Sequence, residues 1–177
     1  MNSSNISELI SEYLEMYANS PSRNHPEPAS ETVRMLRKHP EEAFRIIDTD
    51  AFQKPENLDP RDLDDPLFRL LVTFADVIPD LLIARMTSGF WGARYTYIQC
   101  AAASKCQDFV PTLINLLTDR SIYIKTLILR LITECPHLQV PEAMPKLDKL
   151  SKMKSFQAPS MDRELLEKAR QCVTGKA

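Results

Sequence analysis

The chain has 177 residues, enough for one domain with a sizeable core, and a formal net charge of -2. Its three glycines fall far below the usual share of about 7%, which argues against strand-rich folds and phosphate-binding loops because both depend on glycine turns. The amino terminus lacks a secretory signal pattern, and the most apolar segment, 67–83, is interrupted by charged residues and a proline. A cytoplasmic, all-α protein without a membrane span is therefore expected.

The charges are distributed unevenly along the chain. Residues 1–65 contain fourteen acidic and seven basic residues, whereas residues 66–177 contain ten acidic and fifteen basic residues. The two parts therefore present electrostatic fields of opposite sign. Either this is the ordinary surface of solvated helices, or the acidic part forms a patch for a basic partner.

The amino-terminal residues predict helices that differ from the rest of the chain. Asn5 and Glu8 have the spacing of a capping box, and the apolar stripe that follows predicts a helix over 6–18. After a loop and a second helix, Pro40 marks the start of a third. Terminal repeats shield a helical stack from water, so residues 1–52 are interpreted as a divergent helical cap.

The helical pattern stops in an acidic segment, residues 53–65, where two prolines prevent a long helix. This segment is interpreted as a loop whose carboxylates contact a basic partner. Asp65, which precedes Pro66, is also expected to cap the next helix. The acidic residues predicted to bind the partner are Asp59, Asp62, Asp64 and Asp65.

Helical hairpins are predicted over residues 66–177. The clearest is 108–136, where two runs with apolar residues at helical spacing are joined by the short turn TDRS. Such a hairpin cannot bury both apolar faces by itself, so it needs similar hairpins on either side. Pro79, Pro111 and Pro145 lie 32 and 34 residues apart, a period typical of helical-repeat solenoids.

Pro111, Asp119 and Lys125 in this hairpin resemble the Pro, Asp and Arg/Lys spacing of a HEAT repeat. The resemblance implies a right-handed α-α superhelix of HEAT-like hairpins. It also implies that the turn aspartate bonds backbone or the basic residue of a neighbouring repeat, and that the second helix of each hairpin lines a concave surface facing the partner. The preceding unit matches in part, because its Arg94 falls one position later than Lys125 predicts.

The second helices supply the other candidate binding residues. One of these helices follows the turn TSGFWG, and we assume that its residues Tyr97, Ile98, Ala101 and Ala102 face the core. A rotation of about 100° per residue then places other residues of that helix on the outside, and the same phase can be applied to the second helix of the hairpin 108–136. The residues predicted to bind a partner there are Trp91, Arg94, Tyr95, Gln99, Lys125, Thr126 and Arg130. Exposed Trp, Tyr and Arg dominate interface energies, and the basic members would form a stripe one repeat apart.

Two alternatives remain open for these helices. Trp91 and Phe90 either face a partner or plug the hairpin turn. Leu129 is outward in the same phase, so it either anchors a partner or shows that its helix is buried on all sides. Burial of Leu129 is the favoured interpretation.

No catalytic, cofactor-binding or metal-binding residue is predicted. The three histidines adjoin prolines in loops, and the four cysteines form no C-x-x-C pair, which indicates reduced and mostly buried thiols. The expected function is a non-enzymatic protein-binding module, either an inhibitor or immunity protein that masks a partner such as a toxin, or an adaptor or scaffold subunit of a larger complex.

The alternative from another class is an enzyme acting on nucleic acid. Trp91, three residues before Arg94, is weakly similar to the Trp-x-x-Arg element of HEAT-like DNA glycosylases. That function requires a continuous positive groove along Arg94, Lys125, Arg130 and the lysines of 146–154. The negative net charge and the single tryptophan argue against it.

Overall fold

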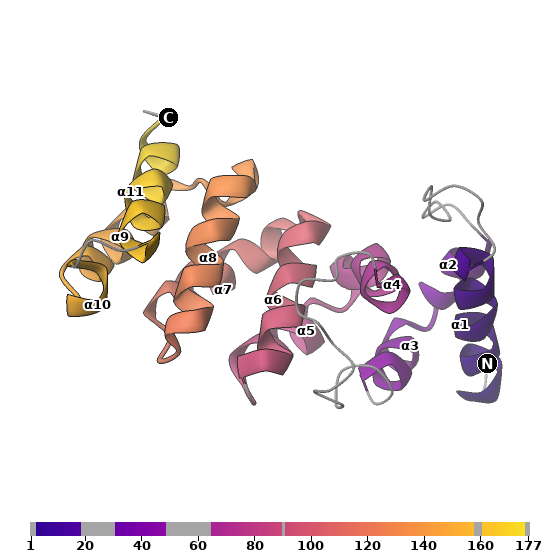
Figure 1. Ribbon diagram of the computed structural model, residues 1–177. Helices are drawn as coiled ribbons and strands as arrows, with labels where there is room; N and C mark the ends of the chain where they lie inside the picture. Colours follow the sequence, from indigo (N-terminus) through magenta and orange to yellow (C-terminus); the bar gives the residue numbers. More distant parts are fainter. Residues whose placement is uncertain (1–2, 19–30, 49–64, 90, 158–160, 176–177) are drawn as a thin grey trace.

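The computed structural model describes residues 3–18, 31–48, 65–89, 91–157 and 161–175. Within these ranges the secondary structure is entirely helical and contains no strand, which confirms the all-α prediction. None of the helices in these ranges combines the length and the apolar character that crossing a membrane requires. The helices are arranged along one row, with the two termini at opposite ends of the row (Figure 1).

Three helices form the amino-terminal end of the row: α1 (Ser3–Ala18), α2 (Glu31–Leu36) and α3 (Pro40–Ile47). Helix α1 packs against both α2 and α3. Helix α1 begins three residues earlier than predicted, so Asn5 and Glu8 lie inside it and the capping-box prediction is wrong. The residues from Asn2 to Asn5 are all of the type that caps helices, so the sequence alone does not select one of them.

The next elements are α4 (Pro66–Phe74), η2 (Ala75–Val77), α5 (Pro79–Thr87) and α6 (Trp91–Ser104). Asp65 caps α4 as predicted, because its Oδ1 accepts hydrogen bonds from the amides of Leu67 at 2.8 Å and Phe68 at 3.0 Å. Helix α5 begins at Pro79. Helices α5 and α6 pack against each other as a hairpin.

The hairpin predicted over 108–136 is present. Its first arm consists of η3 (Gln107–Phe109), α7 (Val110–Asn115) and η4 (Leu116–Thr118), and its second arm is α8 (Ile122–Glu134). The row ends with η5 (Pro136–Leu138), η6 (Pro141–Ala143), α9 (Met144–Ser151), α10 (Lys154–Gln157) and α11 (Met161–Thr174). The short α10 lies between α9 and α11.

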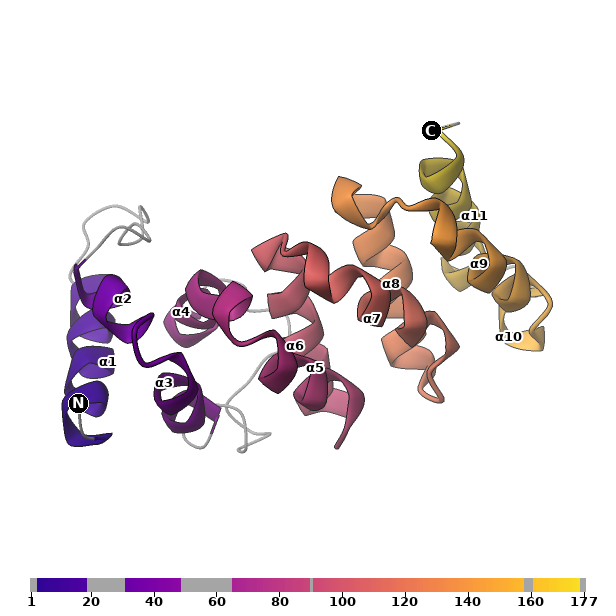
Figure 2. The ribbon, with the colours of Figure 1, turned by 180° about the vertical axis from the view of Figure 1, so that it is seen from behind.

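The hairpins form two layers. Helices α4, α6, α8 and α11 contact one another in succession on one side, while α5, α7 and α9 lie on the other side (Figure 2). Helix α8 therefore packs against α6, α11 and its own hairpin arm. Tyr97, Ile98, Ala101 and Ala102 are buried, as the assumed helix phase requires. Leu129 is completely buried, which confirms the favoured interpretation of that residue.

Polar contacts join the amino-terminal helices to the hairpins. Asp48, buried at the end of α3, accepts hydrogen bonds from the Tyr97 hydroxyl and the Arg85 guanidinium. Arg37 donates to both carboxylate oxygens of Asp76, at 2.9 and 2.8 Å. Burial of the Tyr97 ring, together with the hydrogen bond to Asp48 and its negative charge, raises the pKa of Tyr97, so the phenol stays protonated.

Candidate functional site

A groove of about 400 Å³ lies between α6, α8 and α11. We call it the aromatic groove, and its lining residues are Trp91, Tyr95, Ile122, Tyr123, Thr126, Leu127, Arg130, Met161, Asp162 and Leu165. Four of these are residues that the sequence predicted to bind a partner: Trp91, Tyr95, Thr126 and Arg130. The volume is that of a pocket for a few side chains rather than of a flat contact surface.

Two aromatic rings in the lining of the groove stack on each other. Trp91 begins α6, Tyr123 lies in the first turn of α8, and their rings stack with centroids 4.7 Å apart and an interplanar angle of 22°. Trp91 is 37% exposed and Tyr123 is 59% exposed. Met161, which begins α11, is 84% exposed. Of the four large apolar side chains that are exposed in the described residues, three therefore belong to this groove.

Polar contacts fix the walls of the groove. Arg130 Nη2 donates to the Tyr95 hydroxyl at 2.9 Å, and the Thr126 hydroxyl donates to Asp162 Oδ1 at 3.1 Å. These pairs lie 35 and 36 residues apart, close to the 32 residues that separate Trp91 from Tyr123. Each contact therefore joins residues about one hairpin apart along the chain, and the groove depends on the regular succession of α6, α8 and α11.

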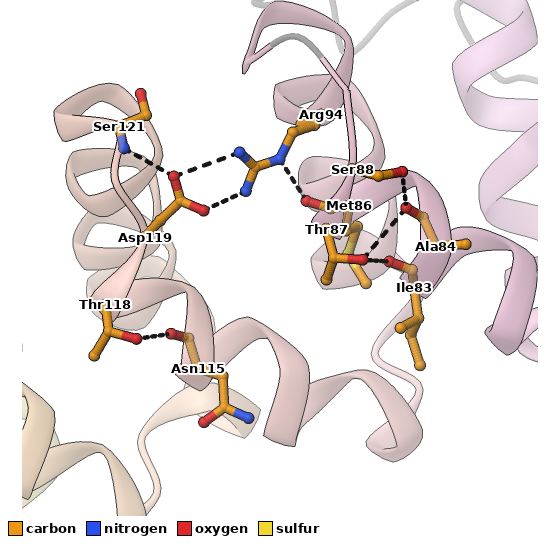
Figure 3. Close-up of polar contacts among 10 residues, drawn as sticks. All are labelled: Ile83, Ala84, Met86, Thr87, Ser88, Arg94, Asn115, Thr118, Asp119 and Ser121. Atoms are coloured by element: carbon orange, nitrogen blue, oxygen red, sulfur yellow. Dashed lines mark hydrogen bonds and ion pairs between the residues drawn. The ribbon is translucent and has the colours of Figure 1, made fainter.

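A second polar cluster lies at the turn ends of the hairpins, shown in Figure 3. Arg94 Nε donates to the Met86 carbonyl at 2.7 Å, and both terminal nitrogens of Arg94 reach the carboxylate of Asp119. Asp119 Oδ1 also accepts from the Ser121 amide at 2.8 Å. The HEAT resemblance implies that the turn aspartate bonds backbone or a basic residue of a neighbouring repeat, and Asp119 does both.

The charge state of Asp119 follows from these contacts. Burial alone would raise its pKa, but the hydrogen bonds from Arg94 and from the Ser121 amide, with the positive charges of Arg94 and Lys125, outweigh burial. The pKa of Asp119 therefore lies below its usual value. The pair is nearly enclosed, because the side chains of Arg94 and Asp119 are 10% and 13% exposed.

Three of the predicted binding residues do not face outward. Arg94, Gln99 and Lys125 are all buried, so their assignment to an exposed binding surface is wrong, and so is the basic stripe along the second helices. The prediction assumed that each second helix buries one face. Helices α6 and α8 instead contact neighbours on several sides, which widens the buried arc and encloses long polar side chains that find local partners.

Of the four acidic residues predicted to bind a partner, only Asp65 lies within the residues that the structure describes. Asp59, Asp62 and Asp64 lie outside the described residues. Asp65 is half-buried, and one of its carboxylate oxygens is used to cap α4. The part of the acidic segment that the structure describes therefore has a structural role.

Sequence reasoning missed Tyr123, Met161 and Asp162 as groove residues. Tyr123 follows Trp91 by 32 residues, which is also the interval from Pro79 to Pro111. The repeat period could therefore have predicted that the two rings lie next to each other. Met161 and Asp162 come from α11, whose place in the groove depends on contacts of α11 with α8 that no local pattern encodes.

Within the described ranges, no group of three or more His, Cys, Asp or Glu side chains is arranged to hold a metal ion. Cys100 is buried, and burial raises the pKa of its thiol. The other three cysteines are half-buried thiols. Comparison of the chain with protein-family models, curated proteins and solved structures found no match.

Proposed function

We propose that this chain is a HEAT-like helical-repeat module that binds another protein through the aromatic groove, without catalysing a reaction. In this proposal the hairpins form a right-handed superhelix, residues 1–52 close its amino-terminal end, and the second helices face the partner. The contacts one hairpin apart and the bridge from Arg94 to Asp119 support a repeated architecture.

The observation that carries the binding function is the exposed stack of Trp91 on Tyr123. Large aromatic rings left in water at a concave site are the residues that contribute most to binding energy when a partner covers them. Arg130, Thr126 and Asp162 supply polar groups to the lining of the same groove, as the edges of protein interfaces do. The groove therefore combines an apolar anchor site with fixed polar groups.

The proposal is tested by replacing Tyr123 with Ala in the full chain. Partners captured from the native cells by the wild-type protein would be identified by mass spectrometry, purified, and titrated by calorimetry. We expect the Tyr123→Ala variant to bind at least about tenfold more weakly, as for the loss of an interface anchor. The matched control is Val77→Ala, which shortens an exposed apolar side chain in η2, outside the groove lining. Equal affinity of wild type and Tyr123→Ala would overturn the proposal.

The proposed module has two possible roles, which differ in how binding responds to salt. An inhibitor or immunity protein that uses the acidic residues Asp59, Asp62 and Asp64 against a basic partner would associate quickly and lose affinity steeply as ionic strength rises. An adaptor or scaffold subunit would depend mainly on apolar contact and respond weakly to salt. Association rates measured at two ionic strengths distinguish the two roles.

A further inference from the structure

The aromatic groove contains a positively charged side chain, Arg130, that forms no ion pair with another described residue. Arg130 is half-buried, and its hydrogen bond goes to the neutral hydroxyl of Tyr95. Other arginines in the described ranges form ion pairs with Asp or Glu: Arg34, Arg37, Arg45, Arg85, Arg94 and Arg170. A guanidinium that has lost part of its hydration without gaining a carboxylate is well placed to accept one from another molecule.

Asp162, the acidic residue in the lining of the groove, has its negative charge stabilised within the chain. Asp162 accepts a hydrogen bond from Thr126 and lies in the first turn of α11, where the helix dipole favours negative charge. No ion pair joins Asp162 to Arg130. The groove thus has exposed apolar side chains at the end marked by Trp91 and Tyr123, and an uncompensated cation farther along α8.

We propose that the aromatic groove binds a peptide segment of the partner that carries one large apolar side chain and one carboxylate. This inference rests on the proposed function and specifies the chemistry of what occupies the groove. The apolar side chain packs between the stacked rings and Leu165, and the carboxylate of an Asp or Glu forms a two-pronged pair with Arg130. Tyr95 holds the guanidinium in position through its hydroxyl.

The spacing of the two anchors follows from α8. Tyr123 and Arg130 are seven residues apart on this helix, which corresponds to about 10 Å along its axis. An extended peptide covers that distance in about three residues and a helical one in about seven. The groove therefore selects a carboxylate about three residues from the apolar side chain in an extended segment, or about seven in a helical one.

The same charges argue against nucleic acid as the occupant. A phosphate backbone binds through several cations at once, and here Arg94 is paired with Asp119 while Lys125 is buried. Asp162 adds a negative charge to the groove lining. One cation beside an apolar site suits a single carboxylate better than a chain of phosphates.

The test selects peptides of roughly twelve residues, long enough for both spacings, from a phage-displayed random library on the full wild-type chain. The enriched peptides are synthesised with their acidic residue or with its amide analogue. Fluorescence anisotropy then gives their affinity for the wild type and for Arg130→Gln. The matched control variant is Arg120→Gln, which alters an exposed arginine outside the groove, and thermal melts establish that both variants are folded.

We expect the enriched peptides to share a large apolar residue and an acidic residue at one of the two spacings. Replacing the acid by its amide is expected to lower affinity about tenfold for the wild type and for Arg120→Gln, but less than about twofold for Arg130→Gln. The inference is overturned by an absence of enriched peptides, by enriched peptides that lack the acid, or by equal losses in all three proteins. Displacement of the peptide by a single-stranded oligonucleotide would also overturn it, in favour of nucleic acid.

These outcomes are separate from failure of the proposed function. If peptides or captured partners depend on Tyr123 but not on Arg130, the groove remains the docking surface and only the acidic anchor is lost. If affinity for the captured partner is unchanged in Tyr123→Ala, the docking function itself is wrong.

Discussion

Two arginines 36 residues apart show how one architecture produces a closed site and an open one. Arg94 on α6 is buried and paired with Asp119, which lies in the turn of the next hairpin. Arg130 on α8 is half-buried and bonded to the neutral Tyr95 hydroxyl at the groove. Arg94 forms its ion pair within the chain and so links two hairpins. Arg130 forms no ion pair within the described residues, so its guanidinium can pair with a carboxylate of another molecule. The same residue type therefore contributes to stability at one place and to recognition at the other.

The largest expected effect on the free energy of unfolding comes from removing the carboxylate that pairs with Arg94. Asp119→Ala leaves the Arg94 guanidinium enclosed without its carboxylate, and we expect a loss of about 3 kcal/mol in the free energy of unfolding. Urea denaturation followed by circular dichroism measures this loss. The matched control is Asp108→Ala, which removes an exposed carboxylate in η3, at the other end of the same hairpin arm, and should change stability by less than about 0.5 kcal/mol. Equal stability of the two variants would show that the Arg94 pair does not fasten the hairpins.

A smaller loss is expected at the joint between the amino-terminal helices and the hairpins. In Asp48→Asn, the amide still accepts from the buried Tyr97 hydroxyl, but the charge that pairs with Arg85 is lost. We expect a decrease of about 1–2 kcal/mol in the same denaturation experiment. Asp148→Asn, which weakens a more exposed pair with Arg170, should cost less than about 0.5 kcal/mol. The reverse order would contradict the role of Asp48 as a buried joint.

Acid should weaken the closed site in a defined pH range. The pKa of Asp119 is lower in the folded protein than in the unfolded chain, so its contribution to stability is fully present above about pH 4 and is lost as the pH falls through the lowered value. Consequently, the difference in unfolding free energy between wild type and Asp119→Asn should be constant near neutral pH and shrink below about pH 4. Chemical denaturation at a series of pH values measures it. A constant difference down to pH 3 would contradict the lowered pKa.

The smallest effect on stability is expected at the open site. Arg130→Gln removes a half-exposed cation whose partner is a hydroxyl, so the free energy of unfolding should change by less than about 0.5 kcal/mol. Arg94→Gln, which leaves the nearly enclosed Asp119 without its guanidinium, should cost about 3 kcal/mol in parallel measurements. If both substitutions destabilised the protein equally, the distinction between the closed and the open arginine would not hold.

Much of the fold could be predicted from local patterns. Apolar spacing and prolines located α4, α5, α7 and α8 to within a few residues, because each pattern reports on contacts made by the helix itself. The cap by Asp65 was predictable for the same reason. The 3-10 turns beside α7 and the short α10 were not predicted, since they depend on how the chain fits against its neighbours.

The shared location of some predicted binding residues could be inferred from the sequence. Trp91, Tyr95, Thr126 and Arg130 were grouped on one surface and do line one groove, whereas Arg94, Gln99 and Lys125 were expected on that surface and are buried. Apolar residues extend around much of α6, so no single face of that helix could be identified from its sequence. Which polar residues are enclosed depends on the neighbouring helices in both directions along the row.

The arrangement of the helices along one row also determines how the protein would respond to mechanical force. The two termini lie at opposite ends of the row, so a pulling force applied to them loads the contacts between successive helices in series (Figure 1). In a series arrangement every joint bears the same tension, and the weakest joint ruptures first while the remaining units stay folded. Under force, the molecule is thus expected to unfold and lengthen in several steps rather than in one event.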